Sequence, residues 1–130
     1  EYRKNNLPED LIFLSASFRG VKSKSVKIKK LVNDLKNKKN QNQPSKIKTS
    51  GSTFKNPISN SRKKVWELIK KSVPLNTSFG EAAISQKHCN FLINKGNATF
   101  QDMLKLIRFI EKNVKLKTGI NLETEIEIIE

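Results

Sequence analysis

An apolar run followed by a long helix with both ends marked is the feature that most constrains the fold. Residues 89–94 (Cys-Asn-Phe-Leu-Ile-Asn) have the composition of a buried strand, and residues 95–97 (Lys-Gly-Asn) that of a turn. Thr99 then stands where a helix N-cap is expected, and Gly119 stands where a C-terminal cap is expected. The sequence therefore predicts a strand at residues 89–94 and a helix over residues 100–117.

The helix predicted over residues 100–117 is amphipathic, and the segment after it has the pattern of a strand. Its apolar stripe consists of Met103, Leu104, Ile107, Ile110 and Val114. Asp102 near its start favours the positive end of the helix dipole. Residues 122–129 alternate between glutamates and mostly apolar residues, as a half-buried strand does. A right-handed β–α–β crossover would set this strand parallel to residues 89–94, in a mixed sheet.

The first third of the chain predicts one strand and one helix before a polar linker. Residues 11–18 are rich in strand formers and alternate toward one face. Residues 23–39 place valine, isoleucine and leucine on one helical face and lysine on the rest. Residues 36–48 are polar and contain a Gln-Pro pair, which favours a loop and a domain boundary.

The region before residue 89 predicts a short helix and a loop. Residues 61–71 carry apolar residues at helical spacing, and Ser61 is the candidate N-cap. Residues 74–80 have the composition of a loop. Together the predicted elements define a small α+β unit with a mixed sheet and packed helices, preceded by a further strand and helix.

The net charge of the chain is compatible with more than one kind of binding partner. The 130 residues carry a formal net charge of +14, which suggests a nucleic acid or another anionic partner. Only four of the 26 basic residues are arginines, whereas nucleic-acid readers favour arginine for bidentate contacts. A compositional bias toward lysine, asparagine and isoleucine is the alternative explanation, and attraction of a phosphorylated substrate is a third.

Cysteine content and hydropathy indicate the compartment. Cys89 is the only cysteine, so no internal disulfide can form, as expected in a reducing environment. No stretch approaches the ~20 apolar residues that a membrane span needs. No secretion signal opens the sequence. These observations predict a cytoplasmic location.

Residues 50–57 (Ser-Gly-Ser-Thr-Phe-Lys-Asn-Pro) are the strongest candidate for chemistry. Their glycine lets a ligand approach the backbone, their serine and asparagine can donate to an oxyanion, and their lysine adds positive charge. A solvated turn is the alternative interpretation. No glycine-rich nucleotide loop is present, and His88 with Cys89 supplies too few ligands for a zinc site.

Residues 51–57 resemble the signature of the UDP-N-acetylenolpyruvoylglucosamine reductase (MurB) family. Further matches in the same order are residues 2–3, 43–44, 66–69, 82–94, 96–99 and 122–126. The resemblance covers essentially the whole chain. It implies a flavoprotein oxidoreductase of peptidoglycan precursor synthesis, which uses FAD and NADPH to reduce UDP-N-acetylglucosamine enolpyruvate to UDP-N-acetylmuramate.

The resemblance also implies roles for single residues. Ser52 matches the family's proton donor. Arg3 and Glu125 match the two partners that hold the substrate carboxylate and stabilise the enolate that forms from it. Surface positions without a catalytic role are the alternative interpretations of Arg3 and Glu125.

A second set of matched residues would bind the substrate and the cofactor. Contacts to the substrate are expected from Tyr2, Lys55, Asn56 and His88, and a contact to FAD is expected from Gly51. The implied partner is UDP-N-acetylglucosamine enolpyruvate. Neither nucleic acid, membrane nor metal is expected, and the protein is expected to be a monomer.

The resemblance further divides the chain. Residues 1–40 match the C-terminal end of a truncated FAD-binding domain, and residues 45–130 match the substrate-binding domain. Most of the FAD site would lie in sequence that this chain lacks, so the piece alone is expected to be inactive. Ser78 and Glu81 depart from the family pattern of a basic residue and a glycine. An inactive relative is therefore one alternative, and a basic nucleic-acid-binding module is another.

Overall fold

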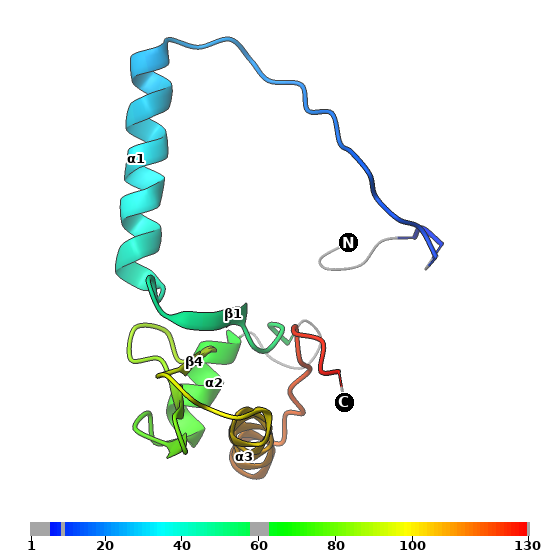
Figure 1. The fold of residues 1–130 in the computed structure, drawn as a ribbon, viewed down its shortest axis with the longest axis vertical. Helices are drawn as coiled ribbons and strands as arrows, with labels where there is room; N and C mark the ends of the chain where they lie inside the picture. Colours follow the sequence, from blue (N-terminus) through cyan, green and yellow to red (C-terminus); the bar gives the residue numbers. More distant parts are fainter. Residues whose placement is uncertain (1–5, 9, 58–62, 130) are drawn as a thin grey trace.

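Helices and short strands make up the fold of the computed structural model, which describes residues 6–8, 10–57 and 63–129 (Figure 1). In chain order the elements are α1 (Ser25–Asn42), β1 (Lys48–Ser52), α2 (Val65–Ser72), β2 (Ser78–Phe79), β3 (Ala82–Ile84), β4 (Phe91–Asn94) and α3 (Phe100–Thr118). The predicted α+β class is confirmed. None of the described helices is both long and apolar enough to span a bilayer.

The sheet is antiparallel at every pairing and has the order β1-β4-β3-β2. β4 is the strand predicted from the apolar run, and it begins two residues later than expected. The predicted mixed sheet and parallel crossover are wrong, because β4 is paired along both edges and has no free edge for residues 122–129. That tail instead makes a single antiparallel bridge, between Thr124 and Phe54.

The core lies where α2 and α3 pack on each other and α3 packs on β2 and β3. Its fully buried apolar side chains include Phe54, Leu68, Ile69, Ile84, Leu92, Leu106, Ile110 and Val114. Burying each such side chain contributes roughly 1.5–3 kcal/mol. The predicted apolar stripe of α3 faces this core in part: Ile107, Ile110 and Val114 are buried, and Met103 packs at the margin. Leu104 was predicted with them but is not part of the core, whereas Leu106, which was not predicted, is fully buried.

Both predicted ends of α3 are confirmed. The Thr99 hydroxyl accepts a hydrogen bond from the Asp102 amide (3.2 Å), and the Asp102 carboxylate accepts one from the Thr99 amide (3.0 Å). The Thr99 backbone and side-chain hydrogen bonds lower the pKa of Asp102. Gly119 adopts a left-handed φ of 73°, which ends the helix one residue later than predicted.

α1 confirms the predicted lysine-rich helix but extends it. The helix begins at Ser25, two residues later than predicted, and continues past residue 39 through residues 40–42, which were expected to belong to a loop. Lysine and glutamine are good helix formers. The helix ends at Gln43, which is extended (φ −126°, ψ 149°). A residue before proline avoids the helical region, and Pro44 follows. No residue of α1 is buried, and Figure 1 shows it standing away from the sheet.

The predicted strand at residues 11–18 is wrong. These residues form no strand, and all of them are exposed. Ile12 is 83% exposed, Leu14 92% and Phe18 93%. A strand needs hydrogen bonds from a neighbour, and none of the described strands lies beside this segment. The apolar pattern therefore has no surface to cover it within the described residues.

The region before β4 differs in two smaller ways. α2 begins at Val65 rather than at residue 61, and the expected cap Ser61 lies outside the described residues. Residues 74–80 were predicted to be a loop, but they contain β2, which pairs with β3 as a hairpin. A strand of two residues is too short to show an alternating pattern.

Glu81, the departure from the family pattern, has a local role. Its carboxylate accepts a hydrogen bond from the Asn97 amide, and its carbonyl accepts one from the Lys95 amide (3.0 Å). The side chain also occupies the space in which a Cβ on Gly96 would sit. Glu81 therefore supports the turn before α3, and the fold accommodates the departure.

Candidate active site

Ser52 lies at the end of β1, directly after an irregularity in the strand. The register with β4 shifts between Thr49 and Ser52, and Gly51 has a φ of 89°, which glycine adopts without strain. Nothing lies within 4 Å of a Cβ built on Gly51, so the backbone before the serine is open. Ser52 is half-buried, and its hydroxyl makes no hydrogen bond to any described residue. That hydroxyl is therefore available to a ligand.

Asn90 holds the residues that follow Ser52. The Thr53 amide donates to the Asn90 carbonyl oxygen (2.8 Å). The Phe54 amide donates to Asn90 Oδ1 (3.0 Å), and Asn90 Nδ2 donates to the Phe54 carbonyl oxygen (2.9 Å). The sequence did not indicate Asn90 as a site residue. An asparagine inside an apolar run was the available signal, because a buried amide needs partners.

The C-terminal tail brings Glu125 to the same segment. The Glu125 amide donates to the Thr53 carbonyl oxygen (2.8 Å), and the Lys55 amide donates to the Glu123 carbonyl oxygen (2.8 Å). Glu125 is half-buried and pairs with the residue directly after Ser52. Two of the three predicted catalytic residues thus lie in one region. The third, Arg3, and the predicted substrate contact Tyr2 lie outside the described residues.

His88 joins this region from the turn before β4. Its Nδ1 accepts a hydrogen bond from the Asn90 amide (3.3 Å), which leaves the proton of a neutral imidazole on Nε2. Its ring meets Phe91 edge-on at 5.0 Å, and Phe91 is the β4 residue opposite Ser52. Partial burial lowers the pKa of His88, opposed by a backbone hydrogen bond, so the neutral donor form is favoured.

Lys55 and Asn56, both predicted to bind substrate, have protein partners. The Lys55 ammonium pairs with the Glu123 carboxylate, and the Lys55 side chain is 33% exposed. Asn56 Oδ1 accepts a hydrogen bond from the Val65 amide (3.1 Å) at the start of α2. Lys55 therefore pairs with the C-terminal tail, and Asn56 pairs with the start of α2.

Two buried side chains near the site differ in their polar contacts. The Thr53 hydroxyl is fully buried and makes no hydrogen bond within the described residues. The Cys89 thiol donates to the Trp66 carbonyl oxygen (3.1 Å), and burial raises its pKa, which opposes the nucleophilic thiolate. Within the described ranges, no group of three or more His, Cys, Asp or Glu residues could hold a metal ion.

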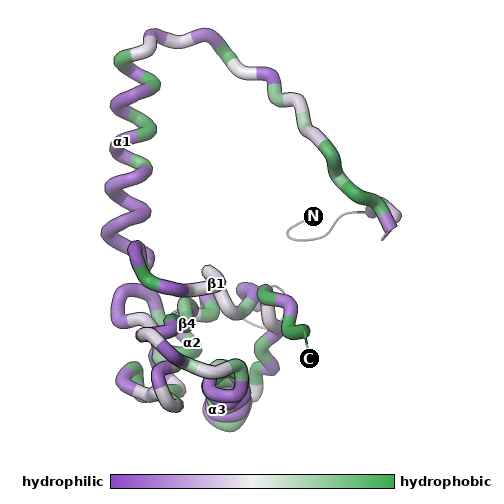
Figure 2. The backbone as a smooth tube through the Cα atoms, in the orientation of Figure 1, coloured by the Kyte–Doolittle hydropathy of each residue, from purple (hydrophilic) through white to green (hydrophobic). Residues whose placement is uncertain are grey.

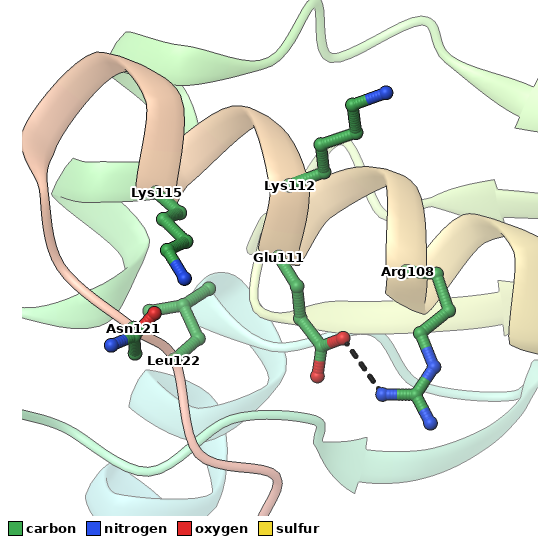
Figure 3. A pocket seen from close by; sticks show the side chains of 6 residues that line it. All are labelled: Arg108, Glu111, Lys112, Lys115, Asn121 and Leu122. Atoms are coloured by element: carbon green, nitrogen blue, oxygen red, sulfur yellow. Dashed lines mark hydrogen bonds and ion pairs between the residues drawn. The ribbon is translucent and has the colours of Figure 1, made fainter.

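A pocket that the sequence did not indicate lies between α3 and the chain after it (Figure 3). Its volume is about 380 Å³, and it is lined by Arg108, Glu111, Lys112, Lys115, Asn121 and Leu122. Arg108 pairs with Glu111 (3.0 Å), and Figure 3 shows the Lys112 side chain pointing away from this pair. None of the predicted site residues lines it, and its positive charge is partly compensated.

The region around Ser52 therefore holds a serine hydroxyl without a described hydrogen-bond partner, a backbone pairing with the tail at Glu125, and the His88 ring packed on Phe91, the residue opposite Ser52. A hydroxyl can give its proton to a strong carbon base once the two are held in place. The imidazole can donate a hydrogen bond to an oxygen of a ligand. This set suits protonation of a carbanion or enolate better than nucleophilic attack, because no described base contacts the Ser52 hydroxyl.

Comparisons with known proteins give consistent results. The family model "UDP-N-acetylenolpyruvoylglucosamine reductase, C-terminal domain" matches residues 43–129. The UDP-N-acetylenolpyruvoylglucosamine reductase of Pelagibacter ubique (strain HTCC1062) is 61% identical over 129 residues, which are 99% of this chain and 43% of that protein. The reductase of Rickettsia typhi (strain ATCC VR-144 / Wilmington) is 43% identical over the same shares.

A solved structure is similar as well. The crystal structure of the reductase MurB from Thermus caldophilus matches with a TM-score of 0.61 and 30% sequence identity. The match covers 78% of this chain and 34% of that chain. The present chain thus spans less than half the length of the curated relatives and the solved structure it matches.

Proposed function

Because the chain belongs to the UDP-N-acetylenolpyruvoylglucosamine reductase family, we propose that it is the C-terminal part of an active reductase. The substrate would be UDP-N-acetylglucosamine enolpyruvate and the product UDP-N-acetylmuramate, a precursor of peptidoglycan. The observation that supports this proposal is the Ser52 hydroxyl, which makes no hydrogen bond to a described residue and directly precedes Thr53, whose carbonyl accepts from the Glu125 amide.

FAD and NADPH are the proposed cofactors. When bound, FAD would supply the hydride, taken from NADPH, to the vinyl carbon of the substrate. The residues present fit a planar group near Ser52, because Gly51 leaves its backbone face open. Most of the FAD site would belong to sequence outside this chain, so the 130-residue chain alone is proposed to be inactive.

Ser52 would complete the reduction as the proton donor. Hydride addition to the vinyl carbon leaves an electron pair on the neighbouring carbon, delocalised into the carboxylate as an enolate. The Ser52 O–H bond breaks, the new C–H bond uses that electron pair, and the alkoxide regains a proton from solvent. A serine hydroxyl is a weak acid, but the carbanion is a much stronger base. General acid catalysis of this kind accelerates a reaction by roughly 10²–10⁴-fold.

Other residues would hold the substrate during this transfer. Arg3 and Glu125 would bind the substrate carboxylate and stabilise the enolate as charge grows on its oxygens. The UDP-sugar would contact Tyr2, Lys55, Asn56 and His88, with His88 donating from Nε2. Lys55 and Asn56 would then exchange part of their present protein contacts for contacts to the ligand.

The exposed apolar residues before β1 support the proposed division into domains. Residues 1–40 would belong to the FAD-binding domain and residues 45–130 would form the substrate-binding domain. α1 exposes Val26 (79%), Leu31 (60%) and Leu35 (58%), and Figure 2 shows hydrophobic positions recurring along it and along the chain before it. Such a surface is stable in water only when another part of the protein covers it.

We further propose that the complete protein is cytoplasmic, is a monomer and binds no nucleic acid. The substrate is a charged sugar nucleotide, and lysine-rich surfaces can attract its diphosphate. Salt-sensitive binding of DNA or RNA at micromolar concentration by the same protein would contradict this part of the proposal.

A reductase assay on the complete protein that carries this sequence tests the proposal. The protein should purify with a bound flavin and oxidise NADPH only when UDP-N-acetylglucosamine enolpyruvate is present. The product should have the mass of UDP-N-acetylmuramate. A folded flavoprotein without turnover would contradict the activity and favour the alternative of an inactive relative.

A further inference from the structure

We propose that Asn90 is a positioning residue, which sets Ser52 against the tail segment that carries Glu125. Its side chain hydrogen-bonds the backbone of Phe54, two residues after Ser52. The inference rests on the proposed reductase function and deepens it, because it names a residue through which the proton donor is held in place.

Asn90 continues the pairing of the sheet with its side chain as well as its main chain, whose carbonyl accepts from the Thr53 amide (2.8 Å). β4 begins at Phe91, and Asn90 lies in the turn before it. A carboxamide carries N–H donors and a carbonyl acceptor in one plane, so one of its donors and its oxygen can pair as a peptide group does. Asn90 Oδ1 and Nδ2 therefore pair with both backbone groups of Phe54 (3.0 and 2.9 Å), as a neighbouring strand would.

The tail holds the opposite edge of the same segment. The Thr53 carbonyl accepts from the Glu125 amide, and the Lys55 amide donates to the Glu123 carbonyl, both at 2.8 Å. Residues 53–55 thus form an extended segment between Asn90 on one edge and the tail on the other. Removing the Asn90 carboxamide would free both backbone groups of Phe54 and leave only the bond from the Thr53 amide to the Asn90 carbonyl on that edge.

The two hydrogen bonds between the Asn90 carboxamide and the Phe54 backbone, here called the clamp, are shielded from water. Asn90 is 3% exposed, Phe54 1% and Thr53 0%. Inside a protein an unpaired backbone group has no solvent to bond with, so these hydrogen bonds have no competing partner. On the preceding side, the Gly51 amide donates to the Thr49 hydroxyl (3.3 Å), and Ser52 itself lies opposite Phe91 of β4 after a shift in register. The position of the serine therefore depends on β4 and on the residues that follow it.

Positioning errors are costly for proton transfer. A displacement of about 1 Å in a reacting group can lower a rate by roughly 10²-fold. Hydride transfer between NADPH and flavin does not use the Ser52 hydroxyl, so the same displacement would leave that step unchanged. The two half-reactions therefore separate a positioning role from general damage to the protein.

Asn94 provides a matched control at the other end of β4. Its Oδ1 accepts from the amides of Gly96 (2.8 Å) and Ala98 (3.0 Å), and its Nδ2 donates to the Ala98 carbonyl (3.2 Å). It is therefore another asparagine of the same region whose carboxamide makes several backbone hydrogen bonds. Its contacts hold the turn before α3 and none of the residues near Ser52.

The experiment compares Asn90→Asp with Asn94→Asp in the complete reductase, by stopped-flow measurement of both half-reactions. Each variant loses the amide donor and keeps the shape of the side chain. Asn90→Asp should reduce flavin with NADPH at the wild-type rate, but its reoxidation by substrate should slow roughly 10²-fold at saturation, seen in kcat more than in KM. Asn94→Asp should keep both rates within about twofold. Equal reoxidation rates in the two variants would overturn the inference.

The outcomes distinguish this inference from the proposed function. A wild-type protein that cannot be reoxidised by the substrate refutes the reductase function itself. If Asn90→Asp does not fold, Asn90→Ser, which also lacks the amide donor but is small and uncharged, takes its place with the same expected rates. Amide hydrogen exchange on the wild-type chain gives an independent check, since the Phe54 amide should be strongly protected. Rapid exchange at Phe54 would show that the clamp is absent and would overturn the inference.

Discussion

The backbone amide of Glu125 donates a hydrogen bond of 2.8 Å to the carbonyl oxygen of Thr53, the residue next to Ser52. Two helices and three strands separate these residues along the chain. The bond brings the C-terminal tail to the end of β1, so that the backbone of Glu125 pairs with the residue directly after Ser52. The two proposed catalytic residues are therefore brought to neighbouring segments by the folded domain as a whole.

Replacing Ser52 by alanine in the complete protein should block the second half-reaction alone. Flavin reduction by NADPH should stay at the wild-type rate, because that step does not use the hydroxyl. Reoxidation by the enolpyruvyl substrate should slow by roughly 10²–10⁴-fold, the usual contribution of a general acid. Ser50→Ala, an exposed position in the same strand, is the control and should change neither rate. Fast reoxidation by the Ser52 variant would show that another group supplies the proton.

Deleting residues 1–42 should leave the remaining domain folded. α1 contains no buried residue, and the described hydrogen bond that joins it to the rest is an exposed one from Lys87 to the Asn40 carbonyl (3.0 Å). The free energy of unfolding in urea should change by less than about 1 kcal/mol, as for other exposed contacts.

Deleting residues 120–130 is the contrasting variant for the same measurement. That segment packs Ile120, Leu122, Ile126 and Ile128 against the core. Its removal should destabilise the domain strongly, because the transfer of several apolar side chains to water is unfavourable. If the deletion of residues 1–42 were the more damaging one, the proposed domain boundary would be wrong.

The N-terminal cap of α3 should make stability depend on pH through Asp102. Hydrogen bonds from Thr99 lower the pKa of this carboxyl in the folded state, so the charged carboxylate stabilises the folded state more than the neutral acid does. The stabilisation should be complete above the ordinary pKa of aspartate and should disappear as the pH falls through the lower, folded value. Thermal unfolding of wild type and Asp102→Asn should therefore differ at neutral pH and converge in acid. A difference that is constant across this range would contradict the assignment.

The reactivity of Cys89, the single cysteine, should depend on whether the protein is folded. Burial raises the pKa of Cys89, and only the thiolate reacts with disulfide reagents. In the native chain the thiol should react with such a reagent much more slowly than in urea, where its pKa returns to the ordinary range. The reaction can be followed by absorbance, with a free small thiol as the reference. Equal rates in native and unfolded protein would show that the thiol is not protected.

Local signals in the sequence predicted α3 well because its boundaries depend on neighbouring residues. A threonine cap with an acidic residue three positions later, and a glycine at the other end, act within one helical turn. Pro44 acts in the same local way at the end of α1. By contrast, the alternating patterns of residues 11–18 and 122–129 were insufficient, because a strand exists only where a partner offers a free edge.

The candidate site shows the same division. The sequence alone determined the caps of α3, its apolar face, the buried strand β4 and the polar segment around Ser52, since each depends on residues close together in the chain. The tertiary structure decided which segments meet: β4 is paired on both edges, so the tail turns instead to residues 53–55 and carries Glu125 there. The clamp by Asn90 also required the folded structure, because an amide side chain can replace a peptide group only where a strand ends beside another backbone.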